Sequence, residues 1–262
     1  MENLLEAAHQ NLVDTIRRRV QYANGLWVEG DGWQLYDIGT DTADSHLRGA
    51  TLGADADAAT LLEELESRGY LEGEAVPLRV HPRAFDRVRP LLEQRGFACA
   101  EEAGYPIMAI TRPVSRELAH TVQLVPLDPI GEDVAAEAID TLRSAFTSLT
   151  QSDAEKMMCT GAWTSDPGLR LAVIRDAQSG RIVCAGKLTR TQDSPVAGLY
   201  YISTDSHERG KGYAKDLCTV LTNHAFEGGA QAVILQASTL GEFVYRHLGY
   251  EEIGRYYPFS RP

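Results

Sequence analysis

The apolar and polar positions of this 262-residue chain recur with two periods, which predict helices that alternate with short strands. An apolar stripe from Leu4 to Val20 is typical of an amphipathic helix over 3–22. The following pattern predicts further helices over 59–67 and 83–94, strands over 26–28, 33–38, 76–80 and 105–110, and a loop over 46–58. The first 110 residues are therefore predicted to mix helices and strands.

From residue 122 the pattern begins again with a strand. A strand over 122–126 precedes a helix over 128–146 and a second helix, whose start is predicted from the capping-box sequence Ser152 to Glu155. A hairpin over 169–188 and a central strand follow, and then a helix, a strand and a last helix alternate to about residue 250. This order predicts an α/β (α+β) fold.

The junction between the central strand and the next helix carries the strongest chemical signal. Residues 209–214, Arg-Gly-Lys-Gly-Tyr-Ala, stand directly before the 3.6-residue period of the helix. The first N–H groups of a helix have no intrahelical partner and carry partial positive charge, so they attract an anion. Gly210 and Gly212 allow a close backbone approach or a positive φ, and Arg209 and Lys211 add charge. The loop is suited to a pyrophosphate group.

Two common phosphate motifs are absent from this loop, since it has neither the Gly-x-x-x-x-Gly-Lys-[Ser/Thr] nor the Gly-x-Gly-x-x-Gly spacing. Its Arg-x-x-Gly-x-Ala pattern resembles the acetyl-coenzyme A (acetyl-CoA) loop of the GNAT (GCN5-related) N-acetyltransferase superfamily, [Gln/Arg]-x-x-Gly-x-[Gly/Ala]. Downstream, Tyr245, Gly249 and Tyr250 match the Tyr-x-x-x-Gly-[Phe/Tyr] pattern of the family. Ser238 stands where the family commonly has Asn, which is a departure from the pattern.

The resemblance implies a mixed sheet with helices on both faces and an N-acetyltransferase with acetyl-CoA as co-substrate. It also implies that a primary amine attacks the thioester directly, without a covalent enzyme intermediate. Tyr245 is the implied general acid, since a phenol of pKa ~10 is protonated at neutral pH and can donate to a thiolate of pKa ~8.5. The residues implied in holding the coenzyme are Ile202, Ser203 and Thr204 for the pantetheine arm, Arg209, Gly210, Lys211, Gly212, Tyr213 and Ala214 for the pyrophosphate, and Ser238.

No general base is assigned by the sequence, because the strand before the loop lacks the acidic residue that many members of this superfamily place there. Tyr200, Tyr201 or a chain of waters remains open as the base, and Glu155 is a candidate for lining the acceptor site. His207 and His247 are also candidates because imidazole groups in general suit acid–base chemistry, but both stand in polar surroundings and are predicted to be surface residues.

Several apolar residues near the acceptor side have two interpretations. Phe146, Met157, Met158 and Trp163 are predicted to be core residues rather than the lining of an acceptor pocket. The C-terminal segment 256–259, Tyr-Tyr-Pro-Phe, is expected to close a lid or to cover a sheet edge.

An internal repeat is predicted from two similar helix ends. Residues 91–97, Leu-Leu-Glu-Gln-Arg-Gly-Phe, match 244–250 in type with an offset of 249 − 96 = 153 residues. Residues 1–113 are therefore predicted to be a degenerate GNAT-like domain without a cofactor site, and 114–262 the catalytic domain. The counterpart of Tyr245 in the first half is Leu92, and no Arg-x-x-Gly-x-[Gly/Ala] pattern occurs there. An unrelated α+β cap is the alternative for the first half.

Composition narrows the partners without identifying the acceptor. The net charge of −12 argues against nucleic-acid binding and is compatible with a cationic amine. The four cysteines are scattered, so we expect neither a disulfide framework nor a metal site. The sequence shows neither a membrane span nor a signal peptide, and we expect a cytoplasmic monomer or homodimer.

Three functions are compatible with the sequence. The first is an N-acetyltransferase that acts on a small-molecule amine, which fits the second half of the chain best. The second is a protein acetyltransferase for lysine side chains or N-termini. The third is a non-catalytic acyl-CoA-binding sensor, against which the retention of both the loop and Tyr245 argues. The length of the acyl chain is open, because the loop recognises the coenzyme.

Overall fold

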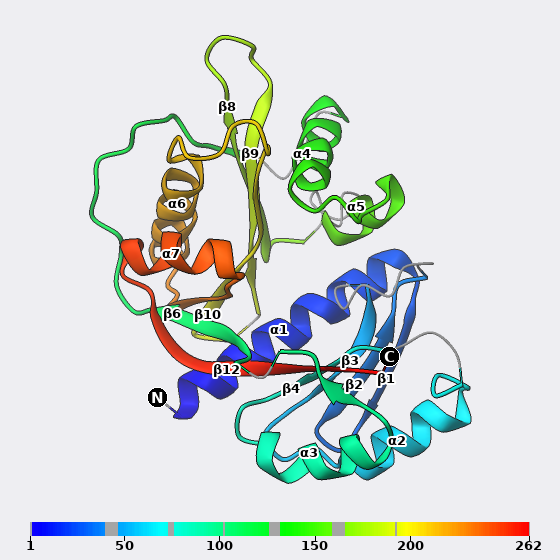
Figure 1. Cartoon of the computed structure of the whole chain (residues 1–262). Helices are drawn as coiled ribbons and strands as arrows, with labels where there is room; N and C mark the ends of the chain where they lie inside the picture. Colours follow the sequence, from blue (N-terminus) through cyan, green and yellow to red (C-terminus); the bar gives the residue numbers. More distant parts are fainter. Residues whose placement is uncertain are drawn as a thin grey trace. The chain divides into compact units, whose positions relative to one another are not determined.

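The computed structural model describes residues 2–39, 47–72, 76–101, 103–125, 132–158, 166–191 and 193–261. Their contacts divide the chain into two compact units. Unit 1 comprises Met1–Ile107 and Ile253–Pro262, and unit 2 comprises Met108–Glu252. The predicted mixed α/β fold is confirmed, because each unit holds a mixed sheet with helices packed on it (Figure 1).

Unit 1 is built on a sheet with the strand order β1-β2-β3-β4-β12. The strands are β1 (Leu26–Gly30), β2 (Trp33–Asp37), β3 (Arg48–Leu52), β4 (Leu78–Val80) and β12 (Glu251–Ser260), and the short strand β5 (Ala98–Cys99) also pairs with β12. Only β3 and β4 are parallel among these pairs. The helices are α1 (Glu2–Ala23), α2 (Ala58–Ser67) and α3 (Phe85–Gln94).

Both faces of the unit 1 sheet are covered. Leu52 and Val80 form a buried cluster with Leu61 of α2 and Leu92 of α3, and α1 covers the opposite face (Figure 1). Strand β3 lies in the stretch that the sequence predicted as a loop. Its Gly49 is required there, because a Cβ atom would lie 2.7 Å from the Pro77 carbonyl oxygen. Because glycine is uncommon in strands, Gly49 weakens the strand pattern of β3 in the sequence.

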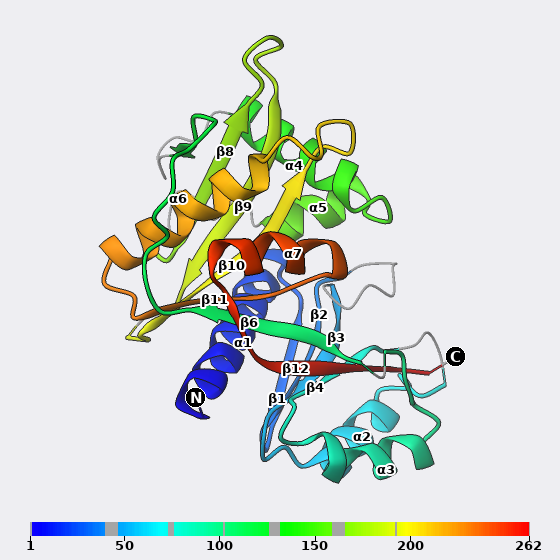
Figure 2. The same ribbon diagram turned by 60° about the vertical axis from the view of Figure 1, so that its left-hand side comes forward.

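Unit 2 holds a sheet with the strand order β11-β10-β9-β8-β7, in which β10 and β11 are parallel. Helices α4 and α5 cover one face, and α6 covers the other with α7 beside it (Figure 2). The strands are β7 (Gln123–Val125), β8 (Leu169–Arg175), β9 (Ile182–Arg190), β10 (Val196–Thr204) and β11 (Ala232–Gln236), and the helices are α4 (Glu132–Ala145), α5 (Gln151–Met158), α6 (Tyr213–Glu227) and α7 (Thr239–Leu248).

The residues of two strands, β6 and β12, are divided between unit 1 and unit 2. From Ile253 onward β12 belongs to unit 1, where it pairs antiparallel with β4. Strand β6 (Tyr105–Ile110) starts in unit 1, but its Met108 and Ile110 are part of the unit 2 core. The segment 256–259 is thus an internal strand rather than a lid. The units also divide the chain elsewhere than at residues 113 and 114, so the predicted functional boundary stays a proposal.

The start of α5 differs from the prediction by two residues. Thr150 Oγ1 accepts a hydrogen bond from the Asp153 N–H at 3.1 Å, and Asp153 Oδ2 accepts one from the Thr150 N–H at 3.2 Å. This is a reciprocal capping box. The expected box on Ser152 and Glu155 is wrong because two overlapping sequences satisfy the same pattern, and the buried Asp153 carboxylate decides between them.

The two helix ends of the predicted repeat have the same backbone geometry. Gly96 and Gly249 adopt left-handed φ angles of 81° and 91°. The Phe97 N–H donates to the carbonyl of Leu92, and the Tyr250 N–H donates to the carbonyl of Tyr245, both at 3.0 Å. Each pair closes a Schellman-type turn with a buried aromatic residue behind it.

Candidate active site

The loop before α6 has the geometry of an anion site. Gly210 and Gly212 adopt φ angles of 82° and 91°, as the glycine pattern predicts, and Gly212 is the N-cap of α6. Within the described part of the chain, the backbone N–H groups of Gly212, Tyr213 and Ala214 make no hydrogen bond. These three donors stand at the positive end of a 15-residue helix.

The basic side chains of the loop lie at the surface. Arg209 is exposed, and Lys211 Nζ lies 2.5 Å from Glu208 Oε2. The hydrogen bond to Glu208 raises the pKa of Lys211, so this amine stays protonated. Because Glu208 already offsets the charge of Lys211, the backbone N–H groups are the better placed donors for an anion.

Strand β10 separates from β11 on the side that leads to this loop. The two strands pair only from Val196 to Gly198 among the described residues, whereas β10 pairs with β9 again at Ser203 and Thr204. The Asp205 N–H donates to the carbonyl of Val183 in β9 at 2.9 Å. Because backbone groups alternate along a strand, Thr204 points its N–H and carbonyl toward the opened side.

The predicted pantetheine residues therefore lie beside an opened strand edge. An extended chain can add to such an edge by main-chain hydrogen bonds. The side chains of two of these residues are engaged on the β9 side, since Ser203 Oγ donates to the Ala185 carbonyl at 3.3 Å and Thr204 Oγ1 to Cys184 Sγ at 3.4 Å. Gly186 leaves room for Ile202, whose Cδ1 would be 2.4 Å from a Cβ atom there.

A bulge in β10 lies between the paired segments. The register shifts between Tyr200 and Ser203, and Tyr201 adopts φ = 55°, which is unusual for a residue with a side chain. The buried Lys187 holds this region, because its Nζ lies 5.0 Å from the centre of the Tyr201 ring and donates to the Met157 carbonyl at 3.1 Å. Backbone strain of this kind is concentrated at functional sites.

Tyr245 points into the core between α6 and α7. Its side chain is 8% exposed and belongs to the cluster that includes Cys218 and Tyr250. A Cβ atom on Gly241 would lie 2.9 Å from Tyr245 Cε2, so this glycine makes room for the ring. Burial raises the pKa of Tyr245 well above its ordinary value, and the nearby Cys218, Tyr250 and Cys184 act in the same direction. The phenol is therefore a hydrogen-bond donor throughout the neutral range.

Ser238 has a structural role at the start of α7. Its Oγ accepts a hydrogen bond from the Gly241 N–H at 3.2 Å, which makes it the N-cap. The hydroxyl proton remains available as a donor to a ligand. The contact of Ser238 with the coenzyme stays a prediction.

Other candidate residues fall into two groups. His207 and His247 are exposed, as predicted, and Glu155 is exposed with its Oε1 3.0 Å from Gln151 Nε2. Met157 and Met158 are fully buried, which confirms their prediction as core. Phe146 is half-buried, and Trp163 lies outside the described residues.

A buried polar cluster beside the glycine loop was not predicted from the sequence. Asp216, in the first turn of α6, is fully buried and accepts hydrogen bonds from the N–H groups of Ala119 and His120 at 3.1 and 2.9 Å. His120 Nδ1 lies 2.7 Å from Asp216 Oδ2, and Arg116 pairs with Asp216 Oδ1. Burial acts to raise the pKa of Asp216, but the hydrogen bonds from His120 and Arg116 outweigh it and lower that pKa. The signal in the sequence that could have indicated this cluster is Asp216 itself, an acidic residue in the first turn of α6.

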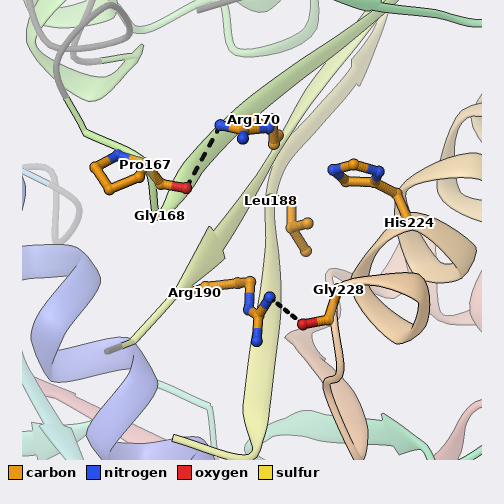
Figure 3. Close-up of a pocket in the computed structure, with 7 residues that line it drawn as sticks. All are labelled: Pro167, Gly168, Arg170, Leu188, Arg190, His224 and Gly228. Atoms are coloured by element: carbon orange, nitrogen blue, oxygen red, sulfur yellow. Dashed lines mark hydrogen bonds between the residues drawn. The ribbon is translucent and has the colours of Figure 1, made fainter. Parts of the chain in front are cut away.

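One pocket of unit 2 lies elsewhere on α6. It encloses about 190 Å³ between the strands β8 and β9 and the C-terminal end of α6 (Figure 3). Arg190 donates there to the Gly228 carbonyl, and Arg170 to the Pro167 carbonyl at 3.4 Å. None of the predicted site residues lines this pocket. We therefore place the candidate site at the N-terminal end of α6.

The ranges that the structure describes hold neither a metal-binding cluster nor a helix that could span a membrane. No group of three or more His, Cys, Asp and Glu side chains there is arranged to hold a metal ion. No helix in those ranges combines the length and apolar character that crossing a membrane requires.

Comparison with known proteins supports the resemblance of the second half. Residues 136–250 match the model of the family described as "Acetyltransferase (GNAT) family". The match spans the glycine loop, β11 and the helix of Tyr245. No curated protein matches the chain.

Solved structures extend the likeness of fold to both halves. A GCN5-related N-acetyltransferase from Kribbella flavida is 19% identical, with 94% of each chain covered and a TM-score of 0.65. Another from Sphaerobacter thermophilus is also 19% identical, with 89% of this chain and 82% of that chain covered and a TM-score of 0.59. A tandem GNAT protein from the clavulanic acid biosynthesis pathway is 11% identical, with 87% and 77% covered and a TM-score of 0.63. The predicted tandem arrangement is consistent with this third likeness.

Proposed function

We propose that the chain is an acetyl-CoA-dependent N-acetyltransferase for a small-molecule amine, because residues 136–250 match the model of the acetyltransferase (GNAT) family. The observation that carries the proposal is the N-terminus of α6, where Gly212 has a positive φ and three N–H groups make no hydrogen bond within the described residues. In the proposal these groups hold the pyrophosphate, and the opened edge of β10 at Ile202–Thr204 holds the pantetheine arm. Arg209 and Lys211 add positive charge at the surface.

The proposed reaction is direct acyl transfer. The amine nitrogen bonds to the thioester carbonyl carbon, the C–S bond breaks, and the nitrogen releases one proton to water. The Tyr245 hydroxyl transfers its proton to the sulfur as the C–S bond breaks. Because burial raises the pKa of Tyr245, a phenolate there would be costly, so the proton passed to sulfur is replaced from solvent.

We place the working cofactor site in the second half only. Leu92 occupies the position equivalent to Tyr245 and is fully buried, so the first half has no donor at that place. This assignment supports a catalytic domain over 114–262 and a degenerate domain over 1–113. It predicts one acetyl-CoA per chain.

Calorimetric titration with acetyl-CoA tests the proposal. We expect one site in the wild type and at least a tenfold loss of affinity in Gly212→Ala, because the left-handed φ costs an L-residue about 1–2 kcal/mol and shifts the loop. Gly180→Ala is a matched control, since Gly180 also has a positive φ, 71°, with open space around it, but lies in the β8–β9 turn. Failure of the wild type to bind acetyl-CoA would refute the proposal, and two sites would refute a silent first half.

The class of acceptor requires a second experiment. A net charge of −12 favours a cationic acceptor, which suits a small amine and also a basic peptide. We expect thiol release with one or more members of a panel of small amines. Incubation of lysate with labelled acetyl-CoA separates the classes, because label on polypeptides supports a protein acetyltransferase. Tight binding without thiol release in either assay supports a sensor.

A further inference from the structure

The linker between β6 and β7 is attached to α6 at two residues, Asn223 and Asp216. Near the C-terminal half of the helix, the Asn223 amide exchanges two hydrogen bonds with the Val114 backbone, at 2.8 and 3.0 Å. Near the N-terminus, the buried carboxylate of Asp216 receives the bonds from Arg116, Ala119 and His120 described above. The linker is therefore an ordered strap that ends at the glycine loop.

The end of the strap places an imidazole against the anion site. The His120 ring lies 4.2 Å from the ring of Tyr213, between ring centres, and its Cε1 is 4.0 Å from the place where a Cβ atom of Gly212 would be. Nδ1 is occupied by Asp216. Nε2 is bonded to Cε1 and so lies at the same end of the ring, next to the loop. In the described part of the chain Nε2 has no hydrogen-bond partner, and the side chain is 24% exposed.

The charges around this ring favour an anion at Nε2. Asp216 fixes the ring by accepting from Nδ1–H, and Arg116 offsets the negative charge that the carboxylate would otherwise present to a phosphate. Among the residues that the structure describes, the ring contacts Asp216 and Tyr213 of α6, and Arg116 of the strap pairs with Asp216. Lys211 of the loop interacts electrostatically with Tyr213, and Cys184 of β9 interacts with Asp216. A phosphate oxygen at Nε2 would stabilise the imidazolium, which donates from both nitrogens.

We propose that His120 is a further coenzyme-binding residue, in which Nε2–H donates to the pyrophosphate held at the N-terminus of α6. The inference rests on the proposed function. It assigns to the strap a role in the site, since Asp216 and Arg116 position the imidazole. The sequence match covers 136–250, so His120 lies outside the matched region.

The variant His120→Asn isolates this contact. The asparagine amide can take the place of Nδ1–H as donor to Asp216, so the strap is retained, but nothing replaces Nε2. A hydrogen bond to a charged group is expected to change the dissociation constant by about 10- to 100-fold. We expect that loss for acetyl-CoA and for its 3′-dephospho form, and no more than about a twofold change for S-acetylpantetheine, which lacks the phosphates.

His224→Asn is the control. It makes the same histidine-to-asparagine substitution, but His224 lies on α6 three turns away from Gly212 and the loop. Its affinity for acetyl-CoA should equal that of the wild type. Equal affinity of His120→Asn and wild type for acetyl-CoA overturns the inference, as does an equal loss for S-acetylpantetheine, which would mean a structural defect. The inference is also overturned if His120→Asn binds the 3′-dephospho form as tightly as the wild type does, since the contact would then be to the 3′-phosphate. A wild type that does not bind acetyl-CoA refutes the proposed function itself, which distinguishes the two failures.

Discussion

The hydroxyl groups of Thr222 and Tyr250 lie 2.6 Å apart in the core of unit 2. Thr222 is on α6, and Tyr250 follows the turn that ends α7, so this bond joins the two helices. Both side chains are buried, and burial raises the pKa of Tyr250. The Tyr250 N–H also donates to the Tyr245 carbonyl, so the bond fixes the end of the helix that carries the proposed acid.

Loss of one partner of this pair should destabilise the protein more than loss of both. Thr222→Val leaves the Tyr250 hydroxyl buried without a partner, which we expect to lower the free energy of unfolding by about 1–3 kcal/mol. In the double variant Thr222→Val/Tyr250→Phe no polar group is left unpaired, and much of the loss should be recovered. Urea unfolding of the wild type, the single variants Thr222→Val and Tyr250→Phe, and the double variant measures the coupling energy between the two hydroxyl groups. A double variant that shows the simple sum of both single losses would contradict it.

Tyr245→Phe should separate chemistry from binding. Phenylalanine keeps the ring that packs over Gly241, so the fold and the affinity for acetyl-CoA should be retained. Removal of the hydroxyl should lower the rate of thiol release by about 10²- to 10⁴-fold, the usual contribution of a positioned proton donor. Steady-state kinetics with an accepted amine measures this effect, and Tyr250→Phe is the control that should lose stability without a comparable loss of turnover. An unchanged rate would remove Tyr245 from the mechanism.

Two buried histidines of unit 1 should make the protein sensitive to acid. Burial lowers the pKa of His9 to about 3, with smaller contributions from His81 and Arg79. Burial likewise lowers the pKa of His81 to about 4, Arg83 adds to this, and Asp55 opposes it. Both rings are therefore neutral in the folded protein at pH 7, and His9 Nδ1 lies 2.9 Å from Tyr256 Oη.

Acid should destabilise the folded protein because the unfolded chain takes up protons that the buried histidines do not bind. Below pH ~6.5 an unfolded histidine binds a proton that the folded one does not, so stability falls as the pH decreases toward the folded pKa values. Between pH 7 and 5 the expected loss is about 2 kcal/mol for each histidine. Urea unfolding at both pH values measures it. His81→Asn, which keeps an acceptor for the Arg83 N–H, should halve the dependence, and equal stability of the wild type at both pH values would contradict the assignment.

The sequence predicted those parts of the fold that depend on local interactions. The glycine loop and the start of α6 are determined by the conformational freedom of Gly212 and by the orphan N–H groups of a helix, both of which act within a few residues. The repeated helix ends at Gly96 and Gly249 were predicted for the same reason, and the structure shows the same turn at each. Local competition explains the error at Thr150, where two capping boxes overlap.

Only the tertiary structure decided the features that join distant parts of the chain. The pairing of β12 with β4 brings together Tyr257 and Val80, which no periodicity relates. The bulge at Tyr201 is held by Lys187 from the neighbouring strand, and the clamp of His120 on Asp216 spans 96 residues. Sequence patterns report backbone preferences and the faces of single elements, whereas these contacts depend on how the packed core orients side chains from separate elements. The sequence by itself therefore determined the resemblance to the family and the conformation of the glycine loop, and the tertiary structure determined the groups that surround the loop.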